Sequence, residues 1–190
     1  MKNTIKYLIL LIMCLACGVN LQAQNYTFRN VVMSDGLSGL LVNTIYKDAE
    51  GFVWLGTDNC LDRFDGVKVK HFEFRGVEEV RKKRVTAIVE TPDKQLWVGN
   101  GIGLWRLNRT KNELERIVPE KIDCSVNALL CNDQILYMGT DRGLFIQKDG
   151  KLTQVLVDKN MLAACNRILD MCLDEEKNQL WLATVQGLFA

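Results

Sequence analysis

The side chains that could support nucleophilic or phosphoryl-transfer chemistry are few and scattered along this sequence. His71 is the single histidine, and it lies between Lys70 and Phe72 in a stretch typical of an outer strand. A helix that could present a phosphoacceptor is not indicated there, and no Ser/His/Asp arrangement can be argued from one histidine. We therefore predict no catalytic residues and no kinase activity for this chain.

Acidic residues occur together at two places, Asp48 with Glu50 and the run 174–176. Both places have the composition of hairpin turns, where turn formation and solvation explain acids better than general acid–base catalysis does. The glycine-rich segment 99–103 joins two strands rather than a strand and a helix, so it does not fit a phosphate-binding loop. These patterns predict no bound cofactor.

Seven cysteines are present, two of them close to the N-terminus. The remaining five are an odd number, so at least one thiol stays unpaired within a monomer. They form no CxxC pair and no Cys/His cluster in the sequence, and we predict no metal site. Most are expected to be small buried apolar residues, with a Cys124–Cys165 bridge between neighbouring repeats as an alternative. The five are Cys60, Cys124, Cys131, Cys165 and Cys172.

The N-terminus has the pattern of a secretory leader. Lys2 and Lys6 precede an uncharged apolar run over 7–16, and Ala23 provides a small residue for cleavage. The pattern predicts a signal peptide over 1–23 and an exported, periplasmic protein.

Two alternatives to this leader are a lipoprotein signal with lipidation at Cys17 and an uncleaved anchor. An anchor needs about 20 apolar residues, more than this run supplies. Loss of the leader removes two lysines and no acid, so the formal charge falls from +1 to −1. A near-neutral chain argues against a nucleic-acid partner, and the basic run 81–84 is expected to be a solvated loop. No membrane contact is expected for residues 24–190.

A motif returns four times at a nearly constant interval. Its aligned aromatic residues are separated by 43, 40 and 44 residues, and these residues are Trp54, Trp97, Tyr137 and Trp181. An interval of about 40 to 50 residues is that of one propeller blade. The chain is therefore predicted to be all-β, with β-propeller blades of four antiparallel strands in about four repeats. The expected blades cover 37–76, 79–119, 120–158 and an incomplete 160–190.

The first copy illustrates the expected strands. Short runs rich in β-branched and aromatic residues predict strands over 42–47, 52–57, 61–64 and 67–74, with a tight hairpin over 48–51. Apolar residues alternate onto both faces of such a sheet, so each face needs a neighbouring blade. The aligned aromatic is predicted to pack between blades. A small residue two positions later is predicted where another backbone comes close, namely Gly56, Gly99, Gly139 and Ala183.

Residues 26–31 precede the first copy and look like another outer strand, which could complete the last blade of a closed ring. The fourth copy ends before an outer strand of its own. The economical interpretation is an incomplete propeller, the N-terminal part of a longer one.

The copies resemble the two-component regulator propeller family, whose repeat combines an Asp–Gly hairpin, an aromatic-x-Gly-Thr strand and a Gly-Leu-x-Arg-Phe/Tyr strand. The resemblance is best over 43–66, good over 96–105 and 137–145, and weaker in the fourth copy, where Ala183 and Val185 replace the usual glycine and aspartate. The opening segments 28–30 and 34–38 also resemble the start of the sensor half of hybrid two-component systems in gut Bacteroidetes. That resemblance implies a receptor with two propellers, an immunoglobulin-like domain, a membrane helix, a histidine kinase, a receiver and a DNA-binding domain, induced by glycan fragments.

The resemblance thus implies a periplasmic ligand-sensing module whose partners are an oligosaccharide, the remaining blades and a second protomer of the parent receptor. Ligand-binding residues are not identified by any pattern. Propeller ligands usually sit at loops on one end of the ring, so the segments to examine are 37–41, 77–84 and 121–124, although each is interpreted first as an ordinary connection. A propeller-fold glycan lyase or hydrolase and a protein-interaction scaffold are the alternatives, since one fold supports many functions.

Overall fold

The strands of the protein form four antiparallel sheets. The computed structural model describes residues 5–7, 27–117, 121–157 and 166–190. The chain divides into two units, Met1–Asn30 and Val31–Ala190, and every described strand lies in the second. The strands are β1 (Val42–Lys47), β2 (Val53–Thr57), β3 (Leu61–Phe64), β4 (Val69–Phe72), β5 (Val85–Glu90), β6 (Leu96–Asn100), β7 (Gly103–Asn108), β8 (Glu113–Ile117), β9 (Val126–Asn132), β10 (Ile135–Thr140), β11 (Gly143–Lys148), β12 (Lys151–Val155), β13 (Ile168–Asp174), β14 (Gln179–Thr184) and β15 (Gly187–Phe189).

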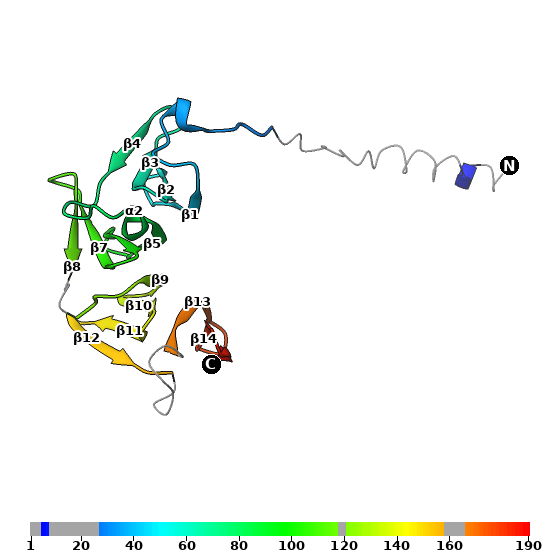
Figure 1. Ribbon diagram of the computed structural model, residues 1–190. Helices are drawn as coiled ribbons and strands as arrows, with labels where there is room; N and C mark the ends of the chain where they lie inside the picture. Colours follow the sequence, from blue (N-terminus) through cyan, green and yellow to red (C-terminus); the bar gives the residue numbers. More distant parts are fainter. Residues whose placement is uncertain (1–4, 8–26, 118–120, 158–165) are drawn as a thin grey trace. The chain divides into compact units, whose positions relative to one another are not determined.

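Each sheet is a meander in which every strand pairs with its neighbour in the sequence. The first strands of successive sheets contact one another, β1 with β5, β5 with β9 and β9 with β13 (Figure 1). Three sheets have four strands, and the described residues of the last form three. The predicted all-β propeller arrangement is confirmed.

The strand limits follow from local turn chemistry. The predicted first and third strands of the first copy coincide with β1 and β3. The predicted strand over 67–74 begins later, at Val69, because Asp65 Oδ1 accepts the backbone N–H groups of Val67 (2.8 Å) and Lys68 (2.7 Å) and so holds both residues in a turn. A local Asx turn therefore competes with the sheet for these residues. The strand also ends earlier, at Phe72.

The aligned aromatic packs toward the following sheet in the first three repeats, as predicted. Trp54 is fully buried in one apolar cluster with Val85 of the next sheet. Trp97 lies in the equivalent cluster with Val126, and half-buried Tyr137 packs against the cluster that contains residues of the fourth sheet. Burying one tryptophan removes about 200 Å² from water, worth about 5 kcal/mol, so these contacts are a major source of cohesion between sheets.

The small residue two positions after the aromatic has a different neighbour from the one predicted. A Cβ placed on Gly56 would lie 2.5 Å from Cγ1 of Val85, and one placed on Gly99 would lie 2.8 Å from Cγ1 of Val126. At Gly56 the close neighbours are thus two β-branched side chains, Thr44 of the same sheet and Val85 of the next, and at Gly99 the Val126 carbonyl oxygen is also within 2.9 Å. The prediction that another part of the chain comes close to these glycines was correct, but the neighbouring atoms belong mainly to side chains and not only to backbone.

A threonine closes the turn between the second and third strands. The hydroxyl of Thr57 accepts the N–H groups of Asn59 (3.1 Å) and Cys60 (3.0 Å). Thr140 accepts the N–H of Arg142 (3.0 Å) and donates to the carbonyl of Gly143 (2.7 Å). The Gly-Thr pair of the repeat therefore combines close packing with a side chain that satisfies the turn.

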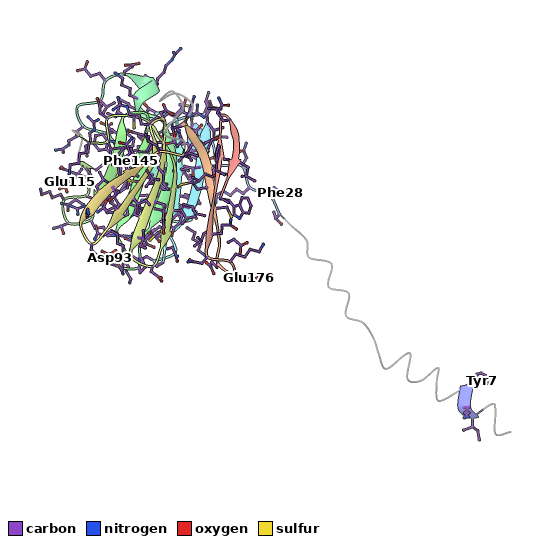
Figure 2. The ribbon with its side chains drawn as sticks, turned by 90° about the horizontal axis from the view of Figure 1, so that it is seen from below. Tyr7, Phe28, Asp93, Glu115, Phe145 and Glu176 are labelled. Carbon is purple, nitrogen blue, oxygen red and sulfur yellow. The ribbon has the colours of Figure 1, made fainter. Side chains whose placement is uncertain are left out.

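The two ends of the sheets carry different connections. Turns from first to second and from third to fourth strands lie at one end, which we name the turn end; Figure 2 shows Asp93 and Glu176, from two such turns, at this end. Turns from second to third strands and the connections between sheets lie at the opposite end, the linker end. One of these connections contains the single-turn helix α2 (Val80–Lys83), whose residues are mostly exposed. The basic run is thus solvated, as predicted, but part of it is helical.

Most of the predicted leader, 1–4 and 8–23, lies outside the described residues. Residues 27–31, part of the predicted closing strand, have no strand conformation, and their role in ring closure stays a prediction. Within the described ranges, no helix combines the length and the apolar character needed to cross a bilayer.

Candidate functional site

A buried carboxylate organises the linker end of the first sheet. Asp62, on β3, is 0% exposed. Its Oδ2 accepts hydrogen bonds from the backbone N–H and the hydroxyl of Ser38, both at 2.8 Å. Its Oδ1 lies 2.7 Å from Nδ1 of His71 and 3.2 Å from Sγ of Cys60. Four contacts of this kind offset part of the cost of removing a carboxylate from water.

Strand pairing explains how these residues meet. Asp62 and His71 are directly opposite each other in the β3–β4 pair, so their side chains emerge on the same face of the sheet. Cys60 precedes Asp62 by two residues and therefore shares that face. Ser38 comes from the segment before β1, which the hydrogen bonds to Asp62 hold against the sheet.

The cluster lacks the contacts of a nucleophilic triad. Among the described residues, the Ser38 hydroxyl makes hydrogen bonds to Asp62 and, at 2.9 Å, to Thr57, and not to His71. Burial raises the pKa of the Cys60 thiol to about 12, so this thiol is protonated at neutral pH. Neither side chain is activated for attack, and the arrangement favours binding over acyl transfer.

A cavity of about 240 Å³ opens beside this cluster. We name it the Asp62 pocket, and its lining is Ser38, Asn59, Cys60, His71, Glu73, Phe74 and Lys83. The imidazole of His71 is about half exposed in this cavity's wall, with its side chain 45% accessible. Phe74 packs edge-on against Trp105 of the next sheet, with ring centroids 5.0 Å apart, and gives the pocket a fixed apolar wall.

A second cavity at the linker end, of about 370 Å³, has a basic lining. It includes Arg81, Arg84 and Arg167 together with polar residues of the first strands. Arg167 Nε lies 2.9 Å from Asp141 Oδ1, so part of its charge is already paired. This cavity suits an anionic group, with two further guanidinium groups available.

The three connections to be examined for a ligand lie in different places. Segments 37–41 and 77–84 each contribute to the Asp62 pocket, and the second also contributes to the basic cavity. Segment 121–124 lines neither cavity, and its Ile122 is fully buried between the second and third sheets.

Sequence reasoning missed the site around Asp62, although an internal signal existed. In the other three copies, glycine occupies the position of Cys60 and an aromatic residue occupies that of Asp62. The aromatic residues are Trp105, Phe145 and Phe189. Only the first copy therefore places polar, reactive side chains at both positions, with His71 across the sheet.

The acidic pair predicted to be a solvated turn is instead part of an ion cluster at the turn end. Asp48 is buried, and its Oδ2 accepts the indole N–H of Trp54 at 2.8 Å. Arg109 of the second sheet pairs with Glu90 of the same sheet (3.0 Å) and reaches across to Glu50 of the first sheet (3.1 Å). The turn assignment was correct and the solvation of Asp48 was wrong, because its carboxylate satisfies buried donors instead of water.

The described cysteines are free thiols. Cys60, Cys124, Cys131 and Cys172 carry no disulfide, so the alternative bridge from Cys124 is not formed. Its proposed partner, Cys165, lies outside the described residues.

Comparison with known proteins identifies the repeat. The sheets define a propeller protein, and residues 36–59 match the two component regulator propeller family. This segment contains β1 and β2 with the threonine-closed turn, so it is a repeat of that family. Histidine kinase P4 of Formosa agariphila is 35% identical over 66 residues, which are 35% of this chain and 5% of that protein.

Solved structures share the fold at low identity. The extracellular domain of a proposed hybrid two component system from B. thetaiotaomicron is 19% identical with a TM-score of 0.65, over 80% of this chain and 21% of that one. PorZ, a surface component of the type-IX secretion system of Porphyromonas gingivalis, is 16% identical with a TM-score of 0.65, over 87% of this chain and 28% of that one. The chain thus spans a small part of each of these relatives.

Proposed function

We propose that this chain is part of the exported, periplasmic ligand-sensing propeller of a hybrid two-component system, and that its ligand is glycan-derived. The family repeat over 36–59, the related stretch of a histidine kinase and the fold shared with the extracellular domain of a proposed hybrid system support this assignment. Kinase and DNA-binding steps belong to other domains of such a receptor, and the chain itself is proposed to bind without catalysis.

The Asp62 pocket is the observation that carries the ligand assignment. Its lining offers a hydroxyl, an amide, an imidazole, a carboxylate and an ammonium group around the apolar wall of Phe74. A sugar presents hydroxyl groups that both donate and accept hydrogen bonds, together with C–H faces that pack on aromatic rings. The Glu73 carboxylate accepts hydrogen bonds and the Lys83 ammonium group donates them, so the two residues together would fix the orientation of such a ligand.

Binding and thermal unfolding of the full 190-residue chain test the proposal. The probes are xylotriose, mannotriose, cellotriose and trigalacturonate, measured by calorimetry and by the shift in Tm, with product analysis after prolonged incubation. One probe class is expected to bind and to raise Tm without being cleaved. Glu73→Gln and Lys83→Met are each expected to weaken that binding at least tenfold.

Glu79→Gln is the matched control, because Glu79 lies in the same connection but does not line the pocket. Its affinity should equal that of the unchanged chain. Cleavage of a bound oligosaccharide would favour a propeller-fold enzyme instead. Binding that both pocket variants leave intact, or no binding of any probe, would overturn the assignment of a glycan to this pocket.

A further inference from the structure

We propose that Cys60, Asp62 and His71 form a zinc site in the wall of the Asp62 pocket, with a fourth position open to water or to a bound ligand. This inference goes beyond the sensory role and does not depend on it, since it concerns a cation held by one sheet. No metal signature was recognised in the sequence, because His71 is brought to Cys60 and Asp62 only by the pairing of β3 with β4.

The three donor atoms converge on one point. One donor atom from each of Cys60, Asp62 and His71 lies within 4.8 Å of the other two, and Oδ1 of Asp62 contacts both His71 Nδ1 and Cys60 Sγ. A sulfur, an imidazole nitrogen and a carboxylate oxygen are the three protein donors that zinc uses. A mixed soft and borderline set of this kind disfavours calcium and magnesium, which take oxygen donors.

The donors need little movement to surround an ion. Zinc bonds of about 2.0 to 2.3 Å in a tetrahedron place neighbouring ligand atoms about 3.3 to 3.6 Å apart. The Nδ1–Oδ1 separation is 2.7 Å and the Sγ–Oδ1 separation is 3.2 Å. Each distance must therefore open by less than about 1 Å. His71, whose side chain is 45% accessible, has the freedom to move by that amount.

Ser38 orients the carboxylate for such a role. Its N–H and hydroxyl both bind Oδ2 of Asp62, which turns Oδ1 toward Cys60 and His71. Outer hydrogen bonds of this kind fix the ligand atoms of a metal site and raise its affinity. The Cys60 backbone is fixed as well, because its N–H and carbonyl both contact the hydroxyl of Thr57.

Packing alone does not require these side chains. The residues that take the place of Asp62 in the second and third sheets are buried aromatics, Trp105 and Phe145. The residues opposite them, in place of His71, are Arg116 and Gln154. Replacing a core aromatic by a buried carboxylate is costly unless the charge is compensated, and a divalent ion compensates it directly.

Zinc binding has a defined proton balance. The Cys60 thiol releases its proton to solvent and binds as thiolate, and Asp62 binds as carboxylate. In the metal-free chain Nδ1 of the neutral imidazole donates its proton to Asp62. On zinc binding Nδ1 gives up that proton and Nε2 takes one up from solvent, so the imidazole stays neutral and both Nδ1 and Asp62 Oδ1 bind the metal. The fourth position faces the pocket.

The test measures zinc binding to the reduced, metal-free 190-residue chain by calorimetry, and cobalt binding by its thiolate-to-metal charge-transfer absorption. One zinc per chain, a rise in Tm and a cobalt–thiolate band are expected. Cys60→Ser retains a hydroxyl that can donate to Asp62, and His71→Asn retains a nitrogen near the Nδ1 position, so each tests the ligand with little change in packing. Both should weaken zinc at least tenfold, and Cys60→Ser should abolish the cobalt–thiolate band.

Cys172→Ser is the control, because Cys172 is an exposed thiol on β13 of the fourth sheet. It should change neither the affinity nor the band. The Tm of each metal-free variant shows whether the fold is retained. Absence of the band in the unchanged chain, or zinc affinity that survives both Cys60→Ser and His71→Asn, would overturn the site.

Discussion

Replacing Asp48 by alanine is expected to destabilise the chain by about 3 to 5 kcal/mol, because one buried carboxylate serves three donors. Its Oδ1 accepts the N–H groups of Glu50 (3.0 Å) and Phe52 (2.9 Å), and its Oδ2 accepts the indole N–H of Trp54 (2.8 Å). Trp54 is 0% exposed, so its N–H would have no water to replace the lost bond, at a cost of about 1 to 3 kcal/mol. The two turn N–H groups can be hydrated and lose about 1 kcal/mol each. The Arg109 contact at 3.8 Å adds little.

The second repeat provides the reciprocal experiment. Thr91 occupies the position of Asp48 and bonds to Asp93 and the Gln95 carbonyl, and the buried indole N–H of Trp97 lacks a partner within the described part of the chain. Thr91→Asp would restore the acceptor that the first repeat has. A gain of about 1 kcal/mol is expected from one added hydrogen bond.

Urea unfolding of the full chain measures both changes through the midpoint at a constant m-value, with tryptophan fluorescence and circular dichroism as independent probes. Glu50→Gln is the control, since the Glu50 side chain is 43% exposed and its pair with Arg109 is worth about 1 kcal/mol or less. An Asp48→Ala loss no greater than that of the control would refute the reasoning. So would a Thr91→Asp variant that unfolds at lower urea than the unchanged chain.

Three further changes test the packing, thiol and turn arguments. Gly56→Ala should cost about 1 to 3 kcal/mol in urea unfolding, because its Cβ would overlap a valine of the next sheet; an unchanged midpoint would contradict the packing account. Cys172 should react with a thiol reagent in the folded chain, whereas Cys60, which is 4% exposed with a pKa of about 12, should react only after unfolding; equal rates would contradict its burial. Backbone hydrogen bonds in the Asp65 turn lower the pKa of the Asp65 carboxyl. The stability that the ionised carboxylate contributes to the fold is therefore fully present above the ordinary pKa of about 4 and is lost as the pH falls through the lowered pKa. Asp65→Asn should flatten the acid limb of a stability–pH curve.

The architecture could be predicted because it repeats and because its signals are local. A hairpin such as 48–51 is encoded by the residues that form it, and the aligned aromatics mark one packing position in each copy. The prediction errors arose where a side chain took backbone hydrogen bonds from the sheet or packed into the space beside a glycine. Asp65 delayed the start of the fourth strand, and the side chains of Thr44 and Val85 rather than a backbone came close to Gly56.

The site could not be predicted in the same way, because its residues are brought together by the register of strand pairing. The pairing of Asp62 with His71 depends on the length of the turn after β3, and one residue of slip would move His71 to the other face. Ser38 lies 24 residues before Asp62 in the sequence and reaches it through a segment without a strand. A single histidine and scattered cysteines in the sequence do not show which residues lie opposite one another in the sheet.

Departure from the repeat is a signal for function only when packing does not already account for it. At the turn end, Arg109 stands where the third sheet has Asp149, and the ion cluster explains the difference because Arg109 pairs with acids of both the first and second sheets. At the linker end, Cys60, Asp62 and His71 lie within one sheet beside a cavity, where an aromatic residue suffices in the other copies. The first departure joins two sheets, whereas the second leaves a charged group to be compensated, and this difference makes the linker end the place to look for a ligand.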